Sequence, residues 1–237
     1  MSAPTAPATR VVLADGFAEA LVTAAPEPLP VPGRAVVLNL APTPALLGGD
    51  PPRPLPPLSS TTLVDGVVER AGLVAVLRVA DDVTGLTGAP GWRHFADLLP
   101  AHPREVALHR GPRTRVGRVE LDAGELLGQE RPDGLGAFDV WLNLWFAPAG
   151  TDCGLHDRHD FIEVHTQLHG LGRMQKFHAD DRASLHEEQL MAPGHTPPVP
   201  FCRTRSDGGF HYPWHQYRAD TDCAWLAVEY HRTGGRG

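Results

Sequence analysis

HDRHDFIEVH, residues 156–165, holds three histidines, two aspartates and one glutamate within ten residues. In its continuation to His169, strand alternation puts five side chains on one face, namely Phe161, Glu163, His165, Gln167 and His169. The side chains between them, Ile162, Val164, Thr166 and Leu168, share the other face, which is mainly apolar and should be buried. A solvated strand face more often carries lysine, arginine and threonine than these metal-coordinating groups. We therefore expect a strand whose polar face lines a functional site.

The chain around this segment is rich in short runs typical of strands. From about Arg113 onward, alternating or apolar runs are separated by Gly, Pro or Asp; they are TRVGRVELDAGEL, FDVWLNLWFAP, DFIEVHTQLHG, GRMQKF, EEQLMAPG and CAWLAVEYH. Ten of the 13 histidines lie between His156 and His231, inside this half. Strands that recur at this interval indicate an antiparallel sandwich or barrel.

The first half of the chain gives weaker patterns. Apolar residues near helical spacing over residues 10–25 indicate a helix, and apolar runs over 34–40 and 73–80 indicate strands. Prolines recur between residues 25 and 60, so this segment is expected to be a covering arm over a sheet or a linker. A short helix is expected over residues 91–100. A degenerate second barrel in this half stays an open alternative.

Composition limits the class of protein. The 237 residues are 42% apolar and 21% charged, and no apolar run approaches the roughly 18 residues that span a bilayer. A formal charge of -7 argues against a general nucleic-acid binder. Three cysteines without a CxxC pair fit a reducing compartment, and the N-terminus lacks a secretion pattern. We expect a cytoplasmic protein, of bacterial composition, with disordered residues 1–9.

The histidine segment resembles the first metal motif of the cupin superfamily. The matching pattern is Gly150-x5-His156-x2-His159-x3-Glu163-x6-Gly170. The usual cupin motif has one residue between the two histidines, so this sequence has one more. Counting back from Glu163 instead would put Asp157 at the first ligand position, and counting from Gly150 favours His156.

A second cupin motif should supply one more histidine before the last strand. Residues 208–231, GGFHYPWHQYRADTDCAWLAVEYH, resemble it with His215 as the ligand. His211 is the alternative, because Gly208 precedes it at the spacing that the motif expects.

The resemblance implies a mainly β fold. Residues 111–237 would form a cupin-type antiparallel β-barrel (a jelly roll or double-stranded β-helix), and residues 1–110 an N-terminal α/β extension. It also implies one divalent metal ion bound by His156, His159, Glu163 and His215, with Glu163 also able to act as a base. Candidates for contact with the substrate or with these ligands are His165, Gln167, Arg173, Gln175 and His211.

Cupins include several classes of protein, so the resemblance leaves the function open. A non-haem Fe(II) oxygenase or dioxygenase acting on a small organic molecule is the leading expectation, with Mn, Ni, Zn or Cu as other candidate metals. The alternatives are an isomerase, epimerase or lyase that uses the metal as a Lewis acid, and a non-catalytic binding protein. Cupins often pair through N-terminal strands, which implies a homodimer. We expect neither nucleic-acid nor membrane partners.

Overall fold

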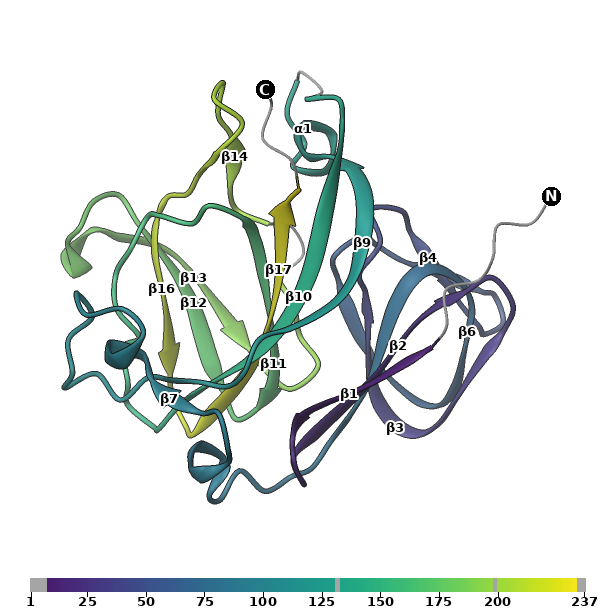
Figure 1. Cartoon of the computed structure of the whole chain (residues 1–237), viewed down its shortest axis with the longest axis horizontal. Coiled ribbons are helices and arrows are strands. Elements are labelled where there is room, and N and C mark those ends of the chain that lie inside the picture. Colours follow the sequence, from purple (N-terminus) through teal and green to yellow (C-terminus); the bar gives the residue numbers. More distant parts are fainter. Residues whose placement is uncertain (1–7, 131–132, 198–199, 234–237) are drawn as a thin grey trace.

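The computed structural model describes residues 8–130, 133–197 and 200–233, and most of them lie in strands (Figure 1). The strands are β1 (Thr9–Ala14), β2 (Ala18–Ala25), β3 (Leu29–Asn39), β4 (Ala45–Leu47), β5 (Arg53–Leu55), β6 (Ser60–Val79), β7 (Arg93–His94), β8 (His109–Arg110), β9 (Thr114–Asp122), β10 (Leu135–Ala147), β11 (Ile162–His169), β12 (Gly172–Phe177), β13 (Leu185–Met191), β14 (Arg203–Thr204), β15 (Phe210–His211), β16 (Trp214–Ala219) and β17 (Cys223–Arg232). One α-helical turn, α1 (Ala123–Leu126), and 3-10 turns at Leu86–Gly88, Phe95–Asp97 and Arg182–Ser184 complete the described elements. The prediction of a mainly β fold with antiparallel sheets is confirmed.

An N-terminal sheet is built from β1 to β6. Its strands β1, β2, β6, β4 and β5 are neighbours in that order, and β3 pairs with β6. The residues buried in its own interior are all alanine, valine or leucine; they are Ala25, Val31, Ala35, Val37, Ala45, Leu47, Leu55, Val68, Ala71, Val74 and Val76. This interior is therefore purely aliphatic.

The helix expected over residues 10–25 is wrong, because this segment is the β1–β2 hairpin. Val11 and Leu13 are buried and Val12 between them is 53% exposed, which is the two-residue period of a strand. Gly16 has a φ of 72° where the chain reverses, a conformation that glycine adopts without steric cost. The expectation of disorder for residues 1–9 falls mostly on residues 1–7, which lie outside the described residues.

The proline-rich segment is neither a covering arm nor a linker, because it supplies β3, β4 and β5 to the N-terminal sheet. β3 lies between the two halves of the long strand β6. It pairs with the half that begins at Ser60 and also with the half that contains Val74 to Leu77. The predicted strands at 34–40 and 73–80 coincide with the ends of β3 and β6, except for their last residues. Of the helix expected over 91–100, only the 3-10 turn Phe95–Asp97 forms.

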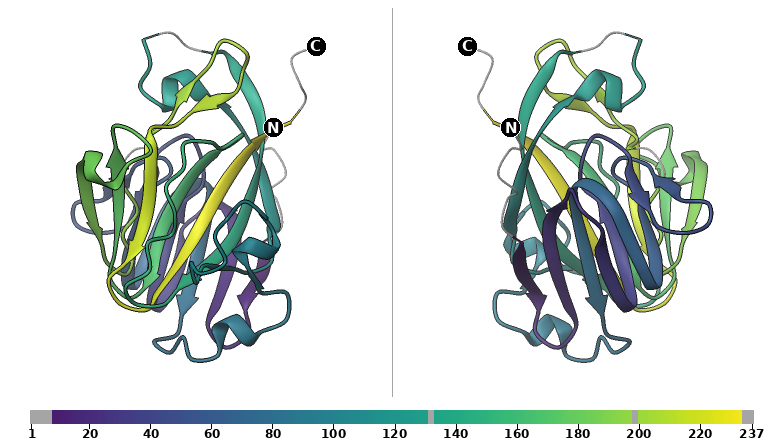
Figure 2. Two further views of the ribbon diagram at one scale, coloured as in Figure 1. Left: turned by 90° about the vertical axis from the view of Figure 1, so that its left-hand side faces the viewer. Right: turned by 90° about the vertical axis from the view of Figure 1, so that its right-hand side faces the viewer.

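The other described strands form two larger antiparallel sheets and the short antiparallel pair β14–β15. The central sheet has the order β11-β17-β10-β8-β7, with β9 paired to β10, and the outer sheet has the order β13-β12-β16. Figure 1 shows the central sheet between the other two, with the N-terminal sheet on the right and the outer sheet on the left. Figure 2 looks at the molecule from either flank, with the N-terminal strands towards the viewer in the right-hand view. The small strands β7 and β8 precede residue 111 but belong to the central sheet.

The central sheet has two different faces. Ile162, Val164 and Leu168 pack with Leu38 and Leu77 of the N-terminal sheet in one hydrophobic core, as the alternation along β11 predicts. The opposite face, called the inner face below, is turned towards the outer sheet. Trp145 and Trp225 on the inner face pack with residues of β12 and β16 in a third cluster. In the described residues, no helix is long and apolar enough to cross a membrane.

Candidate metal centre

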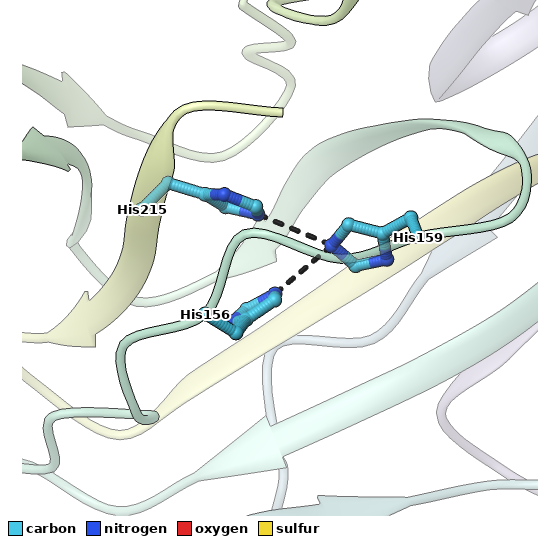
Figure 3. A group of neighbouring side chains, drawn as sticks. All are labelled: His156, His159 and His215. Atoms are coloured by element: carbon cyan, nitrogen blue, oxygen red, sulfur yellow. Dashed lines mark hydrogen bonds between the residues drawn. The ribbon is translucent and has the colours of Figure 1, made fainter. Parts of the chain in front are cut away.

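Three histidines meet between the central and outer sheets (Figure 3). His156 and His159 lie in the loop between β10 and β11, and His215 lies in β16. The backbone N–H of His156 donates to the carbonyl of His215 at 3.1 Å, and the N–H of His215 donates back to the carbonyl of His156 at 2.9 Å. These two hydrogen bonds fix the loop to the strand and hold the two rings side by side.

The three imidazoles point the same atom at one another. Nε2 of His159 lies 2.9 Å from Nε2 of His156 and 3.2 Å from Nε2 of His215. Within the described part of the chain, these three residues form the group of ligand atoms close enough to share one metal ion, all within 4.8 Å of one another. The segments that supply them are more than fifty residues apart in the sequence.

Backbone carbonyls fix which nitrogen carries the proton. Nδ1 of His156 lies 3.0 Å from the carbonyl oxygen of Gly154, and Nδ1 of His215 lies 2.8 Å from that of Pro213. A carbonyl oxygen can only accept, so Nδ1 is the donor and Nε2 keeps its lone pair. Two of the three Nε2 atoms, those of His156 and His215, therefore direct lone pairs at Nε2 of His159. Because metal-binding histidines typically donate their other N–H to a carbonyl or carboxylate, this donor set fits a divalent metal ion.

Burial favours the neutral form of the His159 and His215 rings, which is the form that binds metal. His215 is 1% exposed. Its pKa is lowered well below the usual value, first by burial and then by His156 and His159 beside it. Burial likewise lowers the pKa of His159, although Glu163 opposes the effect.

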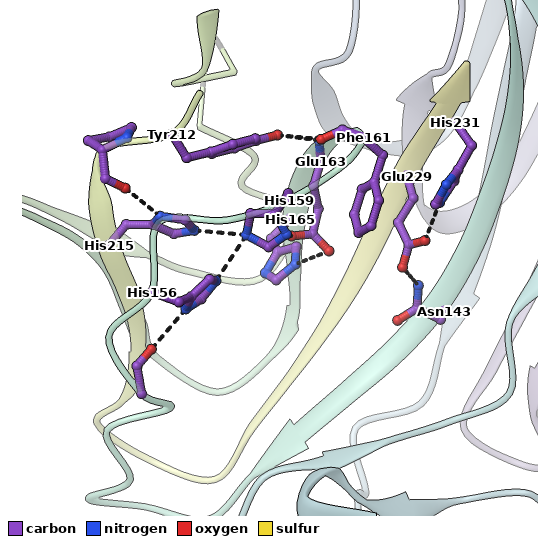
Figure 4. A network of polar contacts seen from close by, with 12 residues as sticks. Asn143, His156, His159, Phe161, Glu163, His165, Tyr212, His215, Glu229 and His231 are labelled. Carbon is purple, nitrogen blue, oxygen red and sulfur yellow. Dashed lines mark hydrogen bonds and ion pairs between the residues drawn. The ribbon is translucent and has the colours of Figure 1, made fainter. Parts of the chain in front are cut away.

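Glu163 lies behind His159 (Figure 4). Its Oε2 is 3.6 Å from Nδ1 of His159, and its Oε1 is 3.2 Å from Nε2 of His165. Burial raises the pKa of this carboxyl, whereas His165 and His159 lower it. The two histidines have the larger combined effect, so the pKa of Glu163 lies below its usual range. Glu163 is not in the group of three ligands. It contacts the nitrogen of His159 that faces away from the other two rings, where an ionised carboxylate orients the ring.

The two ligand alternatives in the sequence separate clearly in space. His156 belongs to the group, whereas the carboxylate of Asp157 lies 3.7 Å from the guanidinium of Arg158. His215 belongs to it as well, whereas His211 in β15 is exposed and lines an open pocket. The structure thus brings together three of the four predicted ligands, and the role of Glu163 as a direct ligand stays a prediction.

The other candidate residues divide between the two faces of their strands. His165 lies on the inner face, stacked on Tyr217 of β16 with ring centroids 4.2 Å apart. Gln167 is fully buried further along β11 and donates to the carbonyl of His169 at 2.6 Å.

Arg173 and Gln175 are not brought to the three histidines. In the register of β12 against β16, Gln175 lies opposite Gln216 and not opposite His215. Gln175 donates to Glu188 and Arg173 donates to Asp220, both at 2.6 Å. Arg173 and Gln175 therefore lie on the face of the outer sheet that points away from the central sheet.

Sequence reasoning missed three neighbours of the histidines. Lys176 follows Gln175 in β12, so its side chain points to the opposite face, and it lies opposite His215. Its Nζ is 5.3 Å from the ring centroid of Phe201. Phe201 packs on His215, with centroids 4.8 Å apart. The hydroxyl of Tyr212 accepts from the N–H of Glu163 and donates to the carbonyl of Phe161, both at 2.9 Å. For Lys176, the missing information was the register of β12 against β16.

An open pocket of about 930 Å³ lies near the histidines. Its lining includes Lys176, Phe201, Pro213 and His211. Phe201 contacts the ring of His215, and the carbonyl of Pro213 accepts from that ring. The pocket therefore borders residues that contact His215, while the three histidines themselves are not among its lining residues.

A second buried carboxylate lies next to Glu163. Glu229 of β17 is directly opposite Glu163 in the pairing of β11 with β17 and is 2% exposed. It forms an ion pair with Arg113, accepts from Nδ2 of Asn143 at 2.7 Å, and lies 2.7 Å from Nε2 of His231 (Figure 4). Because its charge is compensated by these partners, Glu229 is a structural anchor of the inner face.

Comparison with known proteins gives structural matches only. No family model and no curated protein matches the chain. Escherichia coli ycfD is 17% identical over 40% of this chain, with a TM-score of 0.27, and the match spans 26% of that protein's length. A cupin 2 conserved barrel domain protein from Leptotrichia buccalis is 8% identical over 97% of this chain and 91% of its own, with a TM-score of 0.29.

A further match is oxalate decarboxylase from Bacillus subtilis, an enzyme with Mn(II) centres. It is 9% identical over 93% of this chain and 71% of its own, with a TM-score of 0.29. The matched structures thus include cupin proteins, the class that the two histidine motifs resemble. Because all three TM-scores lie below 0.3, the function proposed below rests on the residues of this chain.

Proposed function

We propose that this chain is a metal-dependent cupin enzyme that binds one divalent metal ion through His156, His159 and His215 and acts on a small organic molecule. The observation that carries the proposal is the convergence of three Nε2 atoms at 2.9 and 3.2 Å. It is supported by the two carbonyl acceptors that keep these lone pairs free. Residues 111–237 would form the cupin unit and residues 1–110 its N-terminal extension.

Within this class, the donor set favours a non-haem Fe(II) oxygenase. Three neutral imidazoles suit Fe(II), and also Mn, Ni, Zn or Cu, and an ion held by these three ligands would keep coordination positions free for substrate. Fe(II) held in this way supplies redox chemistry with dioxygen. Glu163 favours the same class over an isomerase, because a carboxylate with a lowered pKa is a weak general base at neutral pH.

The residues around the histidines have separable tasks in this proposal. Glu163 orients His159 and holds the proton at Nδ1 of that ring. Phe201 and Tyr212 pack against the histidines and exclude water from them. Lys176 would attract an anionic substrate towards the site, since it lines the open pocket next to Phe201.

The first test is elemental analysis of the purified protein by inductively coupled plasma mass spectrometry. We expect close to one metal ion per chain, which His215→Ala removes. His211→Ala is the matched control, because His211 comes from the same segment but is exposed outside the group, and it should keep the metal. Equal metal content in the two variants would contradict the proposed ligand set.

The second test addresses iron and its open positions. After anaerobic loading with Fe(II), nitric oxide should produce the electron paramagnetic resonance signal of a high-spin ferrous nitrosyl in the wild type but not in His215→Ala. Zinc or manganese as the native metal, with no such signal after iron loading, would favour the Lewis-acid alternative. A homodimer is also part of the proposal, and calibrated light scattering that gives the monomer mass would contradict it.

A further inference from the structure

Several polar atoms on the inner face of the central sheet are buried without a hydrogen-bond partner in the described residues. Among them are Nε of Arg110, Oδ1 of Asn143, Nε1 of Trp145 and Nδ1 of His165. Asn143 is 0% exposed and His165 is 7% exposed. Buried polar groups nearly always have a hydrogen-bond partner. Several unpartnered polar atoms on one face, called the orphan atoms below, therefore indicate that a partner is missing.

The strand register places these residues next to one another. Arg110 of β8 lies directly opposite Trp145 of β10, and Asn143 is two residues away on the same face. Across the sheet, Asn143 lies opposite Ala227 of β17, and Ala227 lies opposite His165 of β11. The small side chain of Ala227 is therefore the one that separates the Arg110 side of the face from His165 and the histidine group.

Arg110 is the charged member of the set, and in the described residues it has no ion pair. Its neighbour Arg113 is paired with Glu229, and the other inner-face carboxylate, Glu163, is paired with histidines. Burial lowers the pKa of Arg110, and the carboxylates of Glu229 and Glu163 only partly offset that effect. The guanidinium also lies over the ring of Trp145, 5.8 Å from its centroid, which holds it against the inner face. A partly desolvated guanidinium without a carboxylate is a site for an anion.

The orphan atoms also define the chemistry of the missing partner. Nε–H of Arg110 and Nε1–H of Trp145 are donors, which match the oxygens of a carboxylate. Oδ1 of Asn143 is an acceptor, because the amide nitrogen of the same side chain already donates to Glu229. It needs a donor such as a hydroxyl group.

We infer that Arg110, Trp145 and Asn143 form a subsite on the inner face for a small hydroxycarboxylic acid. The carboxylate binds to Arg110 and Trp145, and the hydroxyl donates to Asn143. This inference rests on the proposed function, since it names the substrate class of the same site, with the reacting end of the acid directed past Ala227 to the histidine group.

The test uses three small probes of similar size on the full-length, zinc-loaded protein. L-lactate has a carboxylate and a hydroxyl, propionate has only the carboxylate, and propane-1,2-diol has only hydroxyls. Isothermal titration calorimetry should rank lactate above propionate, with no binding of the diol. A ranking in which the diol binds as well as lactate would overturn the inference.

Variants of Arg110 identify the anchor. Arg110→Gln should weaken lactate and propionate by about tenfold or more, the loss expected for a hydrogen-bonded charge pair. Arg218→Gln is the matched control: Arg218 pairs with Asp152 at 3.0 Å on the other face of β16, and its loss should leave lactate binding unchanged. If Arg110→Gln does not fold, Arg110→Lys keeps the charge but loses the planar fork, and it should bind lactate more weakly than the wild type.

Metal content, counted in every sample, separates the two proposals. Zinc-loaded protein that binds no carboxylate, or binds it equally in Arg110→Gln, would show that water alone satisfies the orphan atoms, and the inference would fail while the metal site stands. Protein that holds no metal but binds lactate through Arg110 would leave the subsite standing and overturn the proposed function.

Discussion

Two buried asparagines show how differently the two parts of the molecule are built. Asn39, in the N-terminal sheet, is 1% exposed and fully bonded: its amide nitrogen contacts the carbonyls of Thr43, Leu55 and Pro56 and its oxygen accepts from Ala41. Asn143, on the inner face of the central sheet, is equally buried, but its oxygen has no partner in the described residues.

The difference extends to everything around them. The cluster inside the N-terminal sheet contains only alanine, valine and leucine. The space between the central and outer sheets contains three converging histidines, the buried carboxylate of Glu229, the mostly buried carboxylate of Glu163 and a half-buried arginine. Satisfied interiors contribute stability, whereas unsatisfied polar interiors are kept where a ligand completes them. The N-terminal sheet is therefore support, and the inner face is where chemistry is expected.

The largest effect on stability should come from the aliphatic interior. Leu47 is 0% exposed, and Leu47→Ala should lower the free energy of unfolding by about 2–5 kcal/mol, since it removes buried contacts and leaves a cavity. Chemical denaturation measures this change, and the metal content should stay at the wild-type value. Leu190→Ala, at a leucine that is 59% exposed, is the control and should change stability little. Loss of metal in Leu47→Ala would break the separation between support and site.

Removing the metal should have the next largest effect. A metal ion present at a hundred times its dissociation constant stabilises the folded state by about 2.7 kcal/mol, so chelation should lower the thermal midpoint of the wild type. The same chelator should not change the midpoint of His215→Ala. A wild-type midpoint that is insensitive to chelation and to added metal would argue against a bound ion.

Glu163→Gln should act on metal affinity more than on the fold. Loss of the carboxylate behind His159 should weaken the affinity for the metal by roughly 10–100-fold, as for other residues that orient a ligand. This change corresponds to about 1.4–2.7 kcal/mol of binding free energy. Competition with a fluorescent chelator measures the affinity. Glu120→Gln, at an exposed position in β9, should leave it unchanged. An intact affinity in Glu163→Gln would remove Glu163 from the site.

The smallest effect should come from the contact that joins the two parts. The hydroxyl of Thr196 lies 2.7 Å from that of Ser60 in β6 and 2.5 Å from that of Thr166 in β11. The coupling free energy between Thr196→Val and Ser60→Ala, which remove one shared hydrogen bond, should be about 1 kcal/mol. A double-mutant cycle with Ser60→Ala, followed by denaturation, gives the coupling. Strict additivity would mean that the two hydroxyls do not interact.

The sequence contains the elements of the site but not how they pair. Strand alternation placed Ile162 and Val164 in a core and Glu163 and His165 on the opposite face, because the period of a strand is local. The resemblance to the two cupin motifs supplied His156, His159 and His215, with Asp157 and His211 as alternatives. Which residues of β12 lie beside His215 depends on the register between two strands some forty residues apart, and no local pattern encodes that register. Arg173 and Gln175 were therefore predicted instead of Lys176.

The N-terminal half was harder to predict, because its turn residues determine the structure more strongly than the spacing of its apolar residues. A weak helical pattern over residues 10–25 gave way to a hairpin around Gly16, and the prolines of residues 25–60 were accommodated within a sheet. The subsite around Arg110 was not visible at all, since β8 is only two residues long and its place opposite Trp145 is a tertiary contact.

The position of β3 between the two halves of β6 also affects how the chain acquires its structure during synthesis. Leu38 of β3 pairs with both Ser60 and Ala75 of β6. Because β3 leaves the ribosome before β6, it cannot complete its pairing until both halves of β6 have emerged. Contacts between residues this distant in sequence slow folding. The N-terminal sheet should consequently close in one late step after residue 79 has emerged, and a nascent chain halted before that point should remain open to proteases.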